Sequence, residues 1–232
     1  YGEYSHRKVT SKIVVEECLA AGVEEKDILF ICSNGLHRKN TPEEIHKILG
    51  DEIFNRFYPK GQIINHDSED WDHLVDLGNE PKFGAKVVLN KYVYDADLAV
   101  MIGHVQGNPY GGYSGGYKHC ATGISNWECI SSHHCPAVMH RPDFMPVSDH
   151  SLMRQKFDAI GDWMEVKMGK KFFSVDAILD SYSNQIAVYA GYAKETEPLT
   201  WEIADKRTYV KWAKKKYDVL VFGLPNDFQY GS

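Results

Sequence analysis

Short apolar segments alternate with helical segments through the first half of this chain, and this alternation is the feature that most constrains its fold. Residues 27–32 form an apolar run that is bounded by charge and by Ser33-Asn34-Gly35, which is typical of a buried strand. Residues 62–65, 85–89 and 95–102 are further strand candidates. Strands that are separated by helices form mostly parallel sheets. We therefore predict an α/β fold in which helices cover both faces of a mostly parallel sheet.

Helices are predicted where capping residues and apolar spacing agree. Thr41 can cap a helix whose first residue is Pro42 and whose first turn is acidic, and this helix should end near Gly50. Further helices are expected at 11–21, 151–168 and 195–216, a strand hairpin at 172–179 and 185–192, and a last strand at 218–223. We expect residues 1–215 to form one domain and residues 216–232 to begin a second, as in a fragment of a longer protein.

Composition limits the possible partners. The chain has 232 residues and a formal net charge of -6, so a nucleic-acid partner has no electrostatic support. No run of about 20 apolar residues is present, so no membrane span is expected. The five cysteines are an odd number without disulfide-scaffold spacing, which favours reduced thiols and a cytoplasmic location.

A glycine-rich loop follows the predicted strand at 95–102. Residues 109–119 (PYGGYSGGYKH) contain four glycines, and glycine lets a backbone turn sharply and approach a ligand closely. Lys118, just past this loop, is a candidate phosphate clamp or covalent attachment point. The spacing fits neither the Walker A motif nor Gly-x-Gly-x-x-Gly, so the common nucleotide-binding loops are excluded. A glycine-rich turn without a ligand is the alternative.

Histidines and cysteines supply further candidates. His37 lies between a predicted strand and a capped helix, where imidazole can act as acid or base, or can simply bind backbone. His119, Cys129 and His134 carry ligands that suit nickel or zinc. Their spacing is not that of a paired Cys-x-x-Cys zinc module, which argues against a structural zinc site.

The order of these motifs resembles that of a known family. The chain is similar over nearly its whole length to the N-terminal domain of the lactate racemase family, the nickel-pincer enzymes. The matching pieces, in order, are Gly35-Leu36-His37-Arg38, Thr41-Pro42-Glu43-Glu44, Asn90-Lys91, Ala96-Asp97, Ile102-Gly103, the run from Gly112 to Lys118, and His134. The Ser-Gly-Gly-x-Lys element, with a histidine sixteen residues after its lysine, is the most specific of them.

The resemblance implies a cofactor and its attachment. Lys118 matches the lysine that is joined covalently to a pyridinium-3,5-bisthiocarboxylic acid mononucleotide, with Ser114, Gly115 and Gly116 in its loop. His134 matches the histidine that completes the nickel site, in which a carbon and two sulfurs come from the cofactor. A soft site of this kind needs only one protein nitrogen.

The resemblance also implies a reaction. The cofactor of the family takes a hydride from the α-carbon of a 2-hydroxy acid and returns it to the other face, which inverts the stereocentre. His37 matches the acid/base residue that acts on the substrate hydroxyl, and Arg7 matches an arginine that binds the substrate or nearby anions. The expected partner is thus a small 2-hydroxy acid; the sequence does not define the oligomeric state.

Two positions depart from the family pattern. Asn108 stands where the family has its second acid/base histidine, and an amide cannot titrate. Three readings remain: His104 or His119 replaces the base, the substrate has changed, or activity is lost and only cofactor or metal binding is kept. Near the C-terminus Gln229 matches a substrate-binding glutamine, whereas its neighbours differ from the family. An ordinary zinc enzyme that uses His119, Cys129 and His134 is a further alternative.

Overall fold

A computed structural model describes residues 6–108, 110–140, 151–180 and 182–208, together with Asp218, Val219 and Val221. The residues before 209 belong to the predicted first domain. Almost all of the predicted second domain, including Gln229, lies outside the described residues, as does most of the expected strand at 218–223. The division into two domains therefore stays a prediction.

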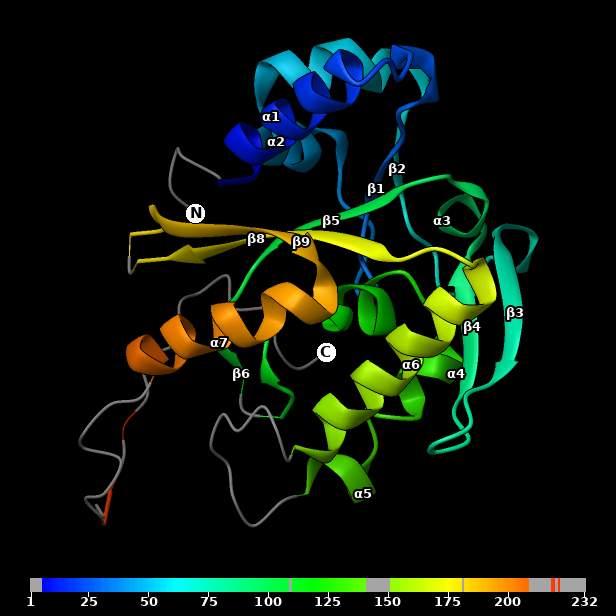
Figure 1. The fold of residues 1–232 in the computed structure, drawn as a ribbon, viewed down its shortest axis with the longest axis vertical. Helices are drawn as coiled ribbons and strands as arrows, with labels where there is room; N and C mark the ends of the chain where they lie inside the picture. The colour runs from blue at the N-terminus through cyan, green and yellow to red at the C-terminus, as the bar shows by residue number, and fades with distance from the viewer. Residues whose placement is uncertain are drawn as a thin grey trace.

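Helices and strands alternate along the chain (Figure 1). The α-helices are α1 (His6–Ala20), α2 (Pro42–Phe57), α3 (Lys91–Asp95), α4 (Trp127–Ser131), α5 (Pro136–Met139), α6 (Leu152–Met168) and α7 (Ala193–Thr208). Three short 3-10 helices are η1 (Glu25–Asp27), η2 (Tyr58–Lys60) and η3 (Trp71–His73), and η4 (His119–Gly123) is a π-helix. The strands are β1 (Phe30–Cys32), β2 (Ile63–Asn65), β3 (Leu74–Asn79), β4 (Lys86–Asn90), β5 (Ala99–His104), β6 (Gly107–Asn108), β7 (Gly112–Tyr113), β8 (Phe172–Leu179) and β9 (Gln185–Tyr192).

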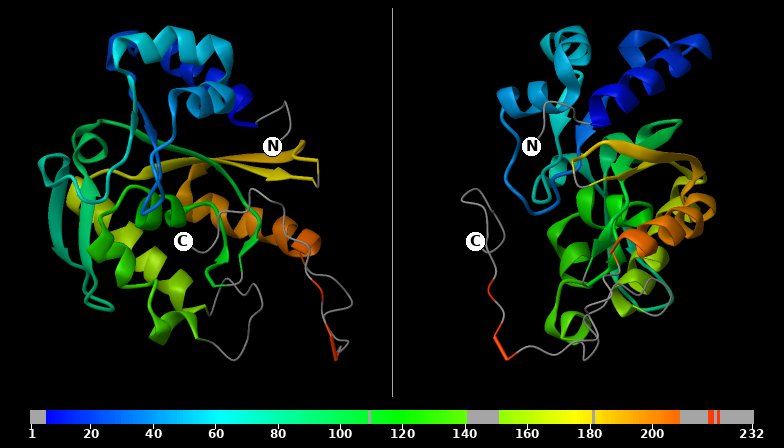
Figure 2. Two further views of the ribbon diagram at one scale, coloured as in Figure 1. Left: turned by 180° about the vertical axis from the view of Figure 1, so that it is seen from behind. Right: turned by 90° about the vertical axis from the view of Figure 1, so that its left-hand side faces the viewer.

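The predicted α/β class is confirmed. In place of one mostly parallel sheet, however, the described strands form separate small sheets that contain both parallel and antiparallel pairs. Strands that are distant in sequence pair in parallel, as β1 does with β2 and β5 with β8. The hairpin partners β3 and β4, β6 and β7, and β8 and β9 pair antiparallel, because a short turn permits this pairing. Helices α1 and α2 lie on one side of the β5-β8-β9 sheet, and α6 and α7 lie on the other (Figures 1 and 2). The carboxyl ends of β1 and β5 therefore lead into the two loops that carry His37 and Lys118.

The two largest of the three apolar clusters among the described residues hold these layers. The larger one joins β4, whose Val87, Val88 and Leu89 are 0% exposed, to α6 through Phe157 and Ile160. The smaller one joins α1 and α2 to β1 and β2, and its buried members are Val15, Ile45, Leu49, Ile53, Phe57 and Ile63. Four of the five residues of β4 are buried, which explains why its apolar run was recognisable as a strand.

Helix α2 begins as predicted but does not end where predicted. The Thr41 hydroxyl accepts a hydrogen bond from the Glu44 amide, and the Glu44 carboxylate accepts one from the Thr41 amide, which is a complete capping box. Gly50 adopts φ +79° and ψ 169°, so it kinks the helix, which then continues to Phe57. Gly50 is thus a kink in α2 and not its end.

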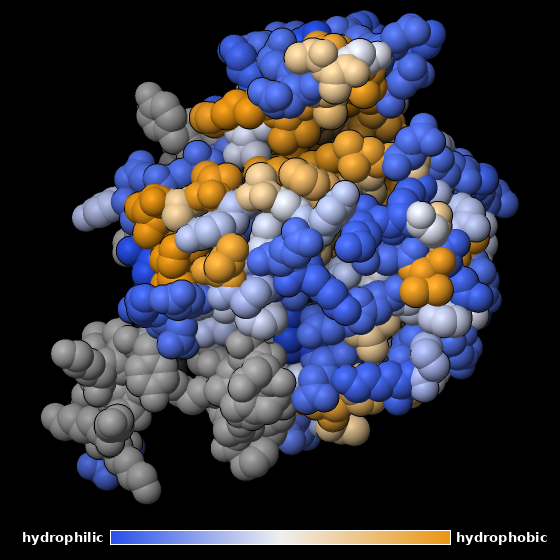
Figure 3. Space-filling model, in the orientation of Figure 1, coloured by the Kyte–Doolittle hydropathy of each residue, from blue (hydrophilic) through white to orange (hydrophobic). Residues whose placement is uncertain are grey.

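Apolar side chains are exposed on α1 and β9. Val9 and Ile13 on α1, and Ile186 and Val188 on the edge strand β9, are each about half exposed. Figure 3 shows apolar surface between the α1–α2 layer and the β8–β9 hairpin. Within the described part of the chain, no helix is both long enough and apolar enough to span a bilayer. All five cysteines are free thiols.

Candidate functional site

The loop after β1 is fastened to the π-helix that follows Lys118. Gly35 has φ +56°, and its amide donates to the carbonyl oxygen of Gly123 at 3.0 Å. A Cβ at Gly35 would lie 2.4 Å from the carbonyl oxygen of Thr122, so only glycine allows this approach. His37 follows two residues later and is exposed, and its amide donates to the Asn34 carbonyl at 2.9 Å. The β1 loop and η4 therefore bring His37 towards Lys118.

We expect Gly35→Ala to destabilise the protein much more than Gly61→Ala. Gly61 also has a positive φ, +72°, but nothing lies within 4 Å of the place that a Cβ would take there, so it controls for backbone strain alone. That strain costs roughly 1–2 kcal/mol. The clash with Thr122 should add about 1–3 kcal/mol in Gly35→Ala. Denaturant unfolding measures both; equal losses would contradict the tight contact between loop and helix.

Two buried acidic side chains accept hydrogen bonds from the backbone of the glycine loop. The Gly116 amide donates to Asp176 Oδ2 at 3.0 Å, and the Tyr117 amide donates to Glu197 Oε1 at 2.9 Å. A Cβ at Gly116 would lie 2.0 Å from Glu197 Oε1, and one at Gly115 would lie 2.4 Å from Val105 Cγ2. The loop backbone can lie directly against the carboxylates of Asp176 and Glu197 because these glycines have no Cβ. Their contact with a cofactor stays a prediction.

Arg154 on α6 completes this support. Its side chain is 0% exposed and pairs with the Glu197 carboxylate. It also donates to the carbonyl oxygens of Tyr113 and Gly115, both at 3.4 Å, and pairs with Asp158 at 3.1 Å. One buried guanidinium therefore links two carboxylates to the backbone of the glycine loop.

Ser114 is used within the loop itself. Its hydroxyl donates to the His104 carbonyl at 2.9 Å and accepts from the Gln106 amide at 3.0 Å. These bonds close the turn between β5 and β7, so the side chain has a structural role whether or not a cofactor is bound.

Asn108 has a similar local role. Its side-chain oxygen accepts hydrogen bonds from the amides of Tyr110 at 3.1 Å and Gly111 at 2.9 Å. This Asx-type turn fixes the start of the glycine loop. The residue that replaces the expected histidine is therefore employed in loop geometry.

Lys118 lies at the junction of the loop and the π-helix. It precedes η4, and its carbonyl accepts from the Thr122 hydroxyl at 2.6 Å. Burial lowers the pKa of its amine to about 8, and the charge of Arg154 acts in the same direction. π-Helical turns often occur at functional sites. An amine with this pKa is largely protonated at pH 7 but has a useful neutral fraction.

His134 interacts with both of the other key residues. It follows α4, its side chain is exposed, and its pKa is lowered first by partial desolvation, then by the positive charge of Lys118, and also by His37. The segments that carry both histidines are also joined to η4, which directly follows Lys118, by the hydrogen bond between Gly35 and Gly123 and by the contact between His133 and Ala121. The structure thus brings together three predicted residues from separate parts of the chain.

A second polar group gathers around the carboxyl end of β5 and the middle of β8. His119 Nε2 lies 3.2 Å from Asp176 Oδ1, and the rings of His6 and His104 meet edge to face at 5.5 Å between centroids. Burial lowers the pKa of His104 to about 4, helped by the charge of Arg7. The predicted Arg7 therefore belongs to this second group. Lys118 belongs to the first group and His119 to the second, so the two groups meet at the Lys118-His119 dipeptide.

The zinc alternative gains no support from this arrangement. Among the described residues, no three His, Cys, Asp or Glu side chains are placed to hold a metal ion. Cys129 is fully buried, and burial raises the pKa of its thiol to about 11. His119 faces Asp176 instead of joining Cys129 and His134.

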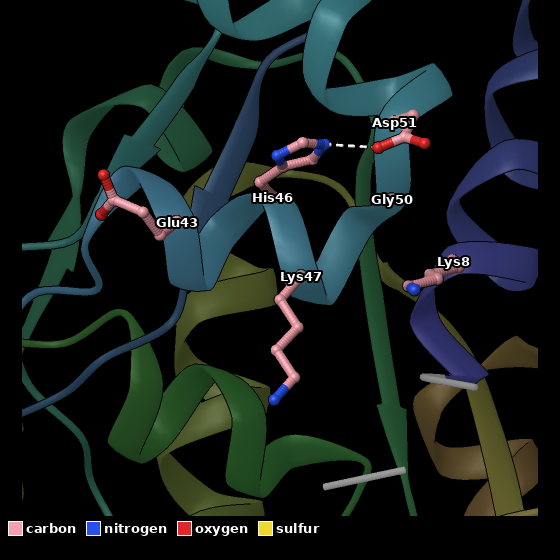
Figure 4. Close-up of a pocket in the computed structure, with 6 residues that line it drawn as sticks. All are labelled: Lys8, Glu43, His46, Lys47, Gly50 and Asp51. Carbon is pink, nitrogen blue, oxygen red and sulfur yellow. Dashed lines mark hydrogen bonds and ion pairs between the residues drawn. The ribbon is translucent and has the colours of Figure 1, made fainter. Parts of the chain in front are cut away.

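A separate hollow lies where α1 meets the kink of α2 (Figure 4). Its lining residues are Lys8, Glu43, His46, Lys47, Gly50 and Asp51. His46 pairs with Asp51 at 2.6 Å, and the lining mixes both signs of charge. It contains none of the predicted site residues, so we place the candidate site at the glycine loop.

Sequence reasoning missed the residues that support this site. Asp176, Glu197 and Arg154 lie 39 to 80 residues from the loop segments that they bind, and no motif marks them. Their only trace in the sequence is that a charged residue interrupts an otherwise apolar face in each of β8, α7 and α6.

Comparison with known proteins agrees with these motifs. Residues 3–145 match the family model described as "Lactate racemase N-terminal domain". A lactate racemase from Thermoanaerobacterium thermosaccharolyticum is 23% identical over 190 residues, and one from Lactiplantibacillus plantarum is 26% identical over 166 residues. The aligned regions cover 81% and 71% of this chain but only 42% and 37% of those proteins.

Solved structures share the fold. The apoprotein of the Thermoanaerobacterium thermosaccharolyticum lactate racemase superposes with a TM-score of 0.74 at 22% identity, over 85% of this chain and 45% of that one. A protein from Thermotoga maritima superposes with a TM-score of 0.73 at 20% identity, over 88% of this chain and 51% of that one. The chain thus spans about half of each of these proteins. With the family model covering more than half of its residues, the chain belongs to the lactate racemase family and corresponds to the N-terminal domain.

Proposed function

We propose that this chain carries the cofactor and acid/base residues of a racemase or epimerase that inverts a 2-hydroxy acid by hydride transfer. The observation that carries the proposal is that η4, which directly follows Lys118, is hydrogen-bonded to the segments of both histidines. Its Gly123 carbonyl accepts from the Gly35 amide, two residues before His37, and its Ala121 carbonyl lies 3.1 Å from Nε2 of His133, the neighbour of His134. The relatives named above are lactate racemases, which supports the reaction class.

The residues present fit a nickel-pincer nucleotide. Burial and Arg154 keep the Lys118 amine partly neutral, as a nucleophile that must form a covalent bond requires. His134 offers one imidazole, and no further ligand cluster accompanies it among the described residues. This donor set suits a metal whose other ligands come from the cofactor. When bound, the cofactor would accept the α-carbon hydride and return it.

His37 would take the proton of the substrate hydroxyl. Removing a hydride from an alcohol carbon leaves a carbonyl only if the hydroxyl proton also leaves, and a neutral imidazole can accept it. Return of the hydride to the opposite face needs a proton donor on that side. Asn108 cannot supply it, because an amide does not titrate and its oxygen is engaged by its own loop.

His119 is the better substitute for the missing base. Its Nε2 is held by Asp176, which is 1% exposed, while about a fifth of the His119 side chain stays accessible. A carboxylate that orients one ring nitrogen leaves the other available for proton transfer. His104 packs against His6 instead, and its pKa near 4 makes it a poor proton donor at neutral pH. Arg7, whose charge acts on His104, would attract the substrate carboxylate.

The experiment is stereochemical inversion by the full-length protein made together with the cofactor pathway. We expect a screen of 2-hydroxy acids and aldonic acids to yield at least one substrate, and His37→Gln and His119→Gln each to lower kcat about 10²- to 10⁴-fold. His73→Gln, in an exposed histidine of η3, is the matched control and should be neutral. Inversion that survives in His119→Gln would exclude its role as the second base.

A non-catalytic binding domain is the second candidate, favoured by the amide at Asn108. It predicts a Lys118 adduct and bound nickel without turnover of any acid in the screen. Turnover that depends on His37 would exclude it.

A further inference from the structure

His133 connects the candidate metal ligand to the π-helix. Its Nε2 lies 3.1 Å from the carbonyl oxygen of Ala121 in η4, and its Nδ1 lies 2.7 Å from Nδ1 of His134. The His133 ring is 0% exposed and packs edge to face on Phe157 at 4.9 Å. The ring is therefore fixed on both edges, whereas the His134 ring is exposed.

The chemistry of these contacts assigns the protons. A carbonyl oxygen only accepts, so Nε2 of His133 must carry a hydrogen. A fully buried imidazole is neutral unless a charged partner compensates it, so Nδ1 of His133 has no hydrogen and accepts. The donor in the 2.7 Å contact is then Nδ1–H of His134. In the neutral imidazole of His134, Nε2 is then left with a free lone pair.

We propose that His133 is a positioning residue that holds His134 in the Nδ1–H tautomer and so presents Nε2 to the nickel ion. The identity of the metal rests on the proposed function; the tautomer does not. A metal-binding histidine usually donates its other N–H to a partner that fixes the ring and raises its basicity. Here that partner is a second histidine, which is itself anchored to the helix that begins after Lys118.

The tautomer is measurable without cofactor or activity. In the full-length apoprotein with ¹⁵N-labelled histidine, long-range ¹H–¹⁵N spectra should show His134 with a protonated Nδ1 and an unprotonated Nε2. His133→Phe keeps the ring packing but removes the acceptor, so His134 should lose this preference. His133→Gln can still accept from His134 and donate to Ala121, so it should retain it. A protonated Nε2 on His134 in the wild type overturns the proposal, even if no variant folds.

Nickel retention supplies an independent readout. After expression with the cofactor pathway, the nickel content is compared with the Lys118 adduct content during dialysis against a chelator. His133→Phe should weaken nickel binding on the order of 10- to 100-fold while the adduct persists. His133→Gln and the exposed control His73→Phe should retain nickel. Equal retention in His133→Phe would overturn the proposal, whereas a missing adduct in the wild type would refute the proposed function and leave the tautomer result standing.

Discussion

Replacing Lys118 with alanine is expected to abolish the proposed covalent cofactor adduct and the proposed racemase activity. The amine is the attachment point that the family resemblance implies, and burial beside Arg154 prepares it for nucleophilic attack. Intact-mass spectrometry of the full-length protein made with the cofactor pathway measures the adduct. Lys91→Ala, which removes an exposed lysine paired with Asp95, should keep it. An adduct that persists in Lys118→Ala would place the attachment elsewhere.

The rate of attachment should follow the neutral fraction of this amine. With a pKa of about 8 in place of 10.5, roughly 300 times more Lys118 is neutral at pH 7. The rate should therefore rise about tenfold per pH unit up to about pH 8 and level off above it. Initial rates of adduct formation from pH 6 to pH 10 measure this. A rise that continues to pH 10 would mean that the amine is not perturbed.

The same pKa has a consequence for stability. The folded state binds the Lys118 proton less tightly than the unfolded chain does, so the charged amine destabilises the fold at neutral pH. This cost is full below about pH 8 and disappears as the pH rises towards 10.5. Lys118→Met should consequently raise the melting temperature at pH 7, and the gain should shrink at higher pH. A loss of activity in this variant could then not be attributed to unfolding.

Local chemistry made part of the fold predictable from sequence. The Thr41 cap and the acidic first turn predicted the start of α2, and the apolar runs predicted β1, β4 and the β8–β9 hairpin. The kink at Gly50 was not predictable, because a positive-φ glycine can end or bend a helix and packing against α1 decides which. The π-helix η4 also escaped prediction, since its residues have no distinctive local preference.

Motif order identified candidate site residues, whose roles stay a prediction. Lys118, His134 and His37 were named in this way, and the charges of Lys118 and His37 both lower the pKa of His134 in the fold. The need for glycine at position 116 was not predictable. A Cβ there would clash with the side chain of Glu197, which is 81 residues away in sequence. Residues that contact a loop from distant parts of the sequence leave no local pattern. Asp176, Glu197 and Arg154 could therefore be identified only from the structure.

These partners make Arg154 the residue whose loss should cost the most stability. Arg154→Met removes the cation between Glu197 and Asp158, and it also removes the donors to the loop carbonyls of Tyr113 and Gly115. Removing one partner of a buried ion pair typically costs about 3–5 kcal/mol. We expect a loss of this size in denaturant unfolding, together with a lower yield of the Lys118 adduct. A loss below about 1 kcal/mol, the size of an exposed pair, would mean that the buried pair does not hold the loop.

Glu197→Gln should be far milder, and its effect should depend on pH. Burial raises the pKa of Glu197 to about 7, although the charge of Arg154 opposes this shift. Between about pH 4.5 and pH 7 the carboxyl therefore holds its proton in the folded state and has lost it in the unfolded chain. The stability contributed by this carboxyl is full below about pH 4.5 and is lost as the pH rises through 7. Glutamine stays neutral, so the variant should gain stability relative to the wild type across that range. A difference that does not change with pH would contradict the raised pKa.

The double variant Arg154→Met/Glu197→Gln separates the two contributions. Much of the cost of Arg154→Met comes from leaving a buried carboxylate without its cation, and neutralising Glu197 removes that penalty. The double variant should therefore be more stable than Arg154→Met alone, with the remaining deficit assigned to Asp158 and to the two loop carbonyls. Strict additivity of the two single changes would show that Arg154 acts on the loop backbone alone, and not through Glu197.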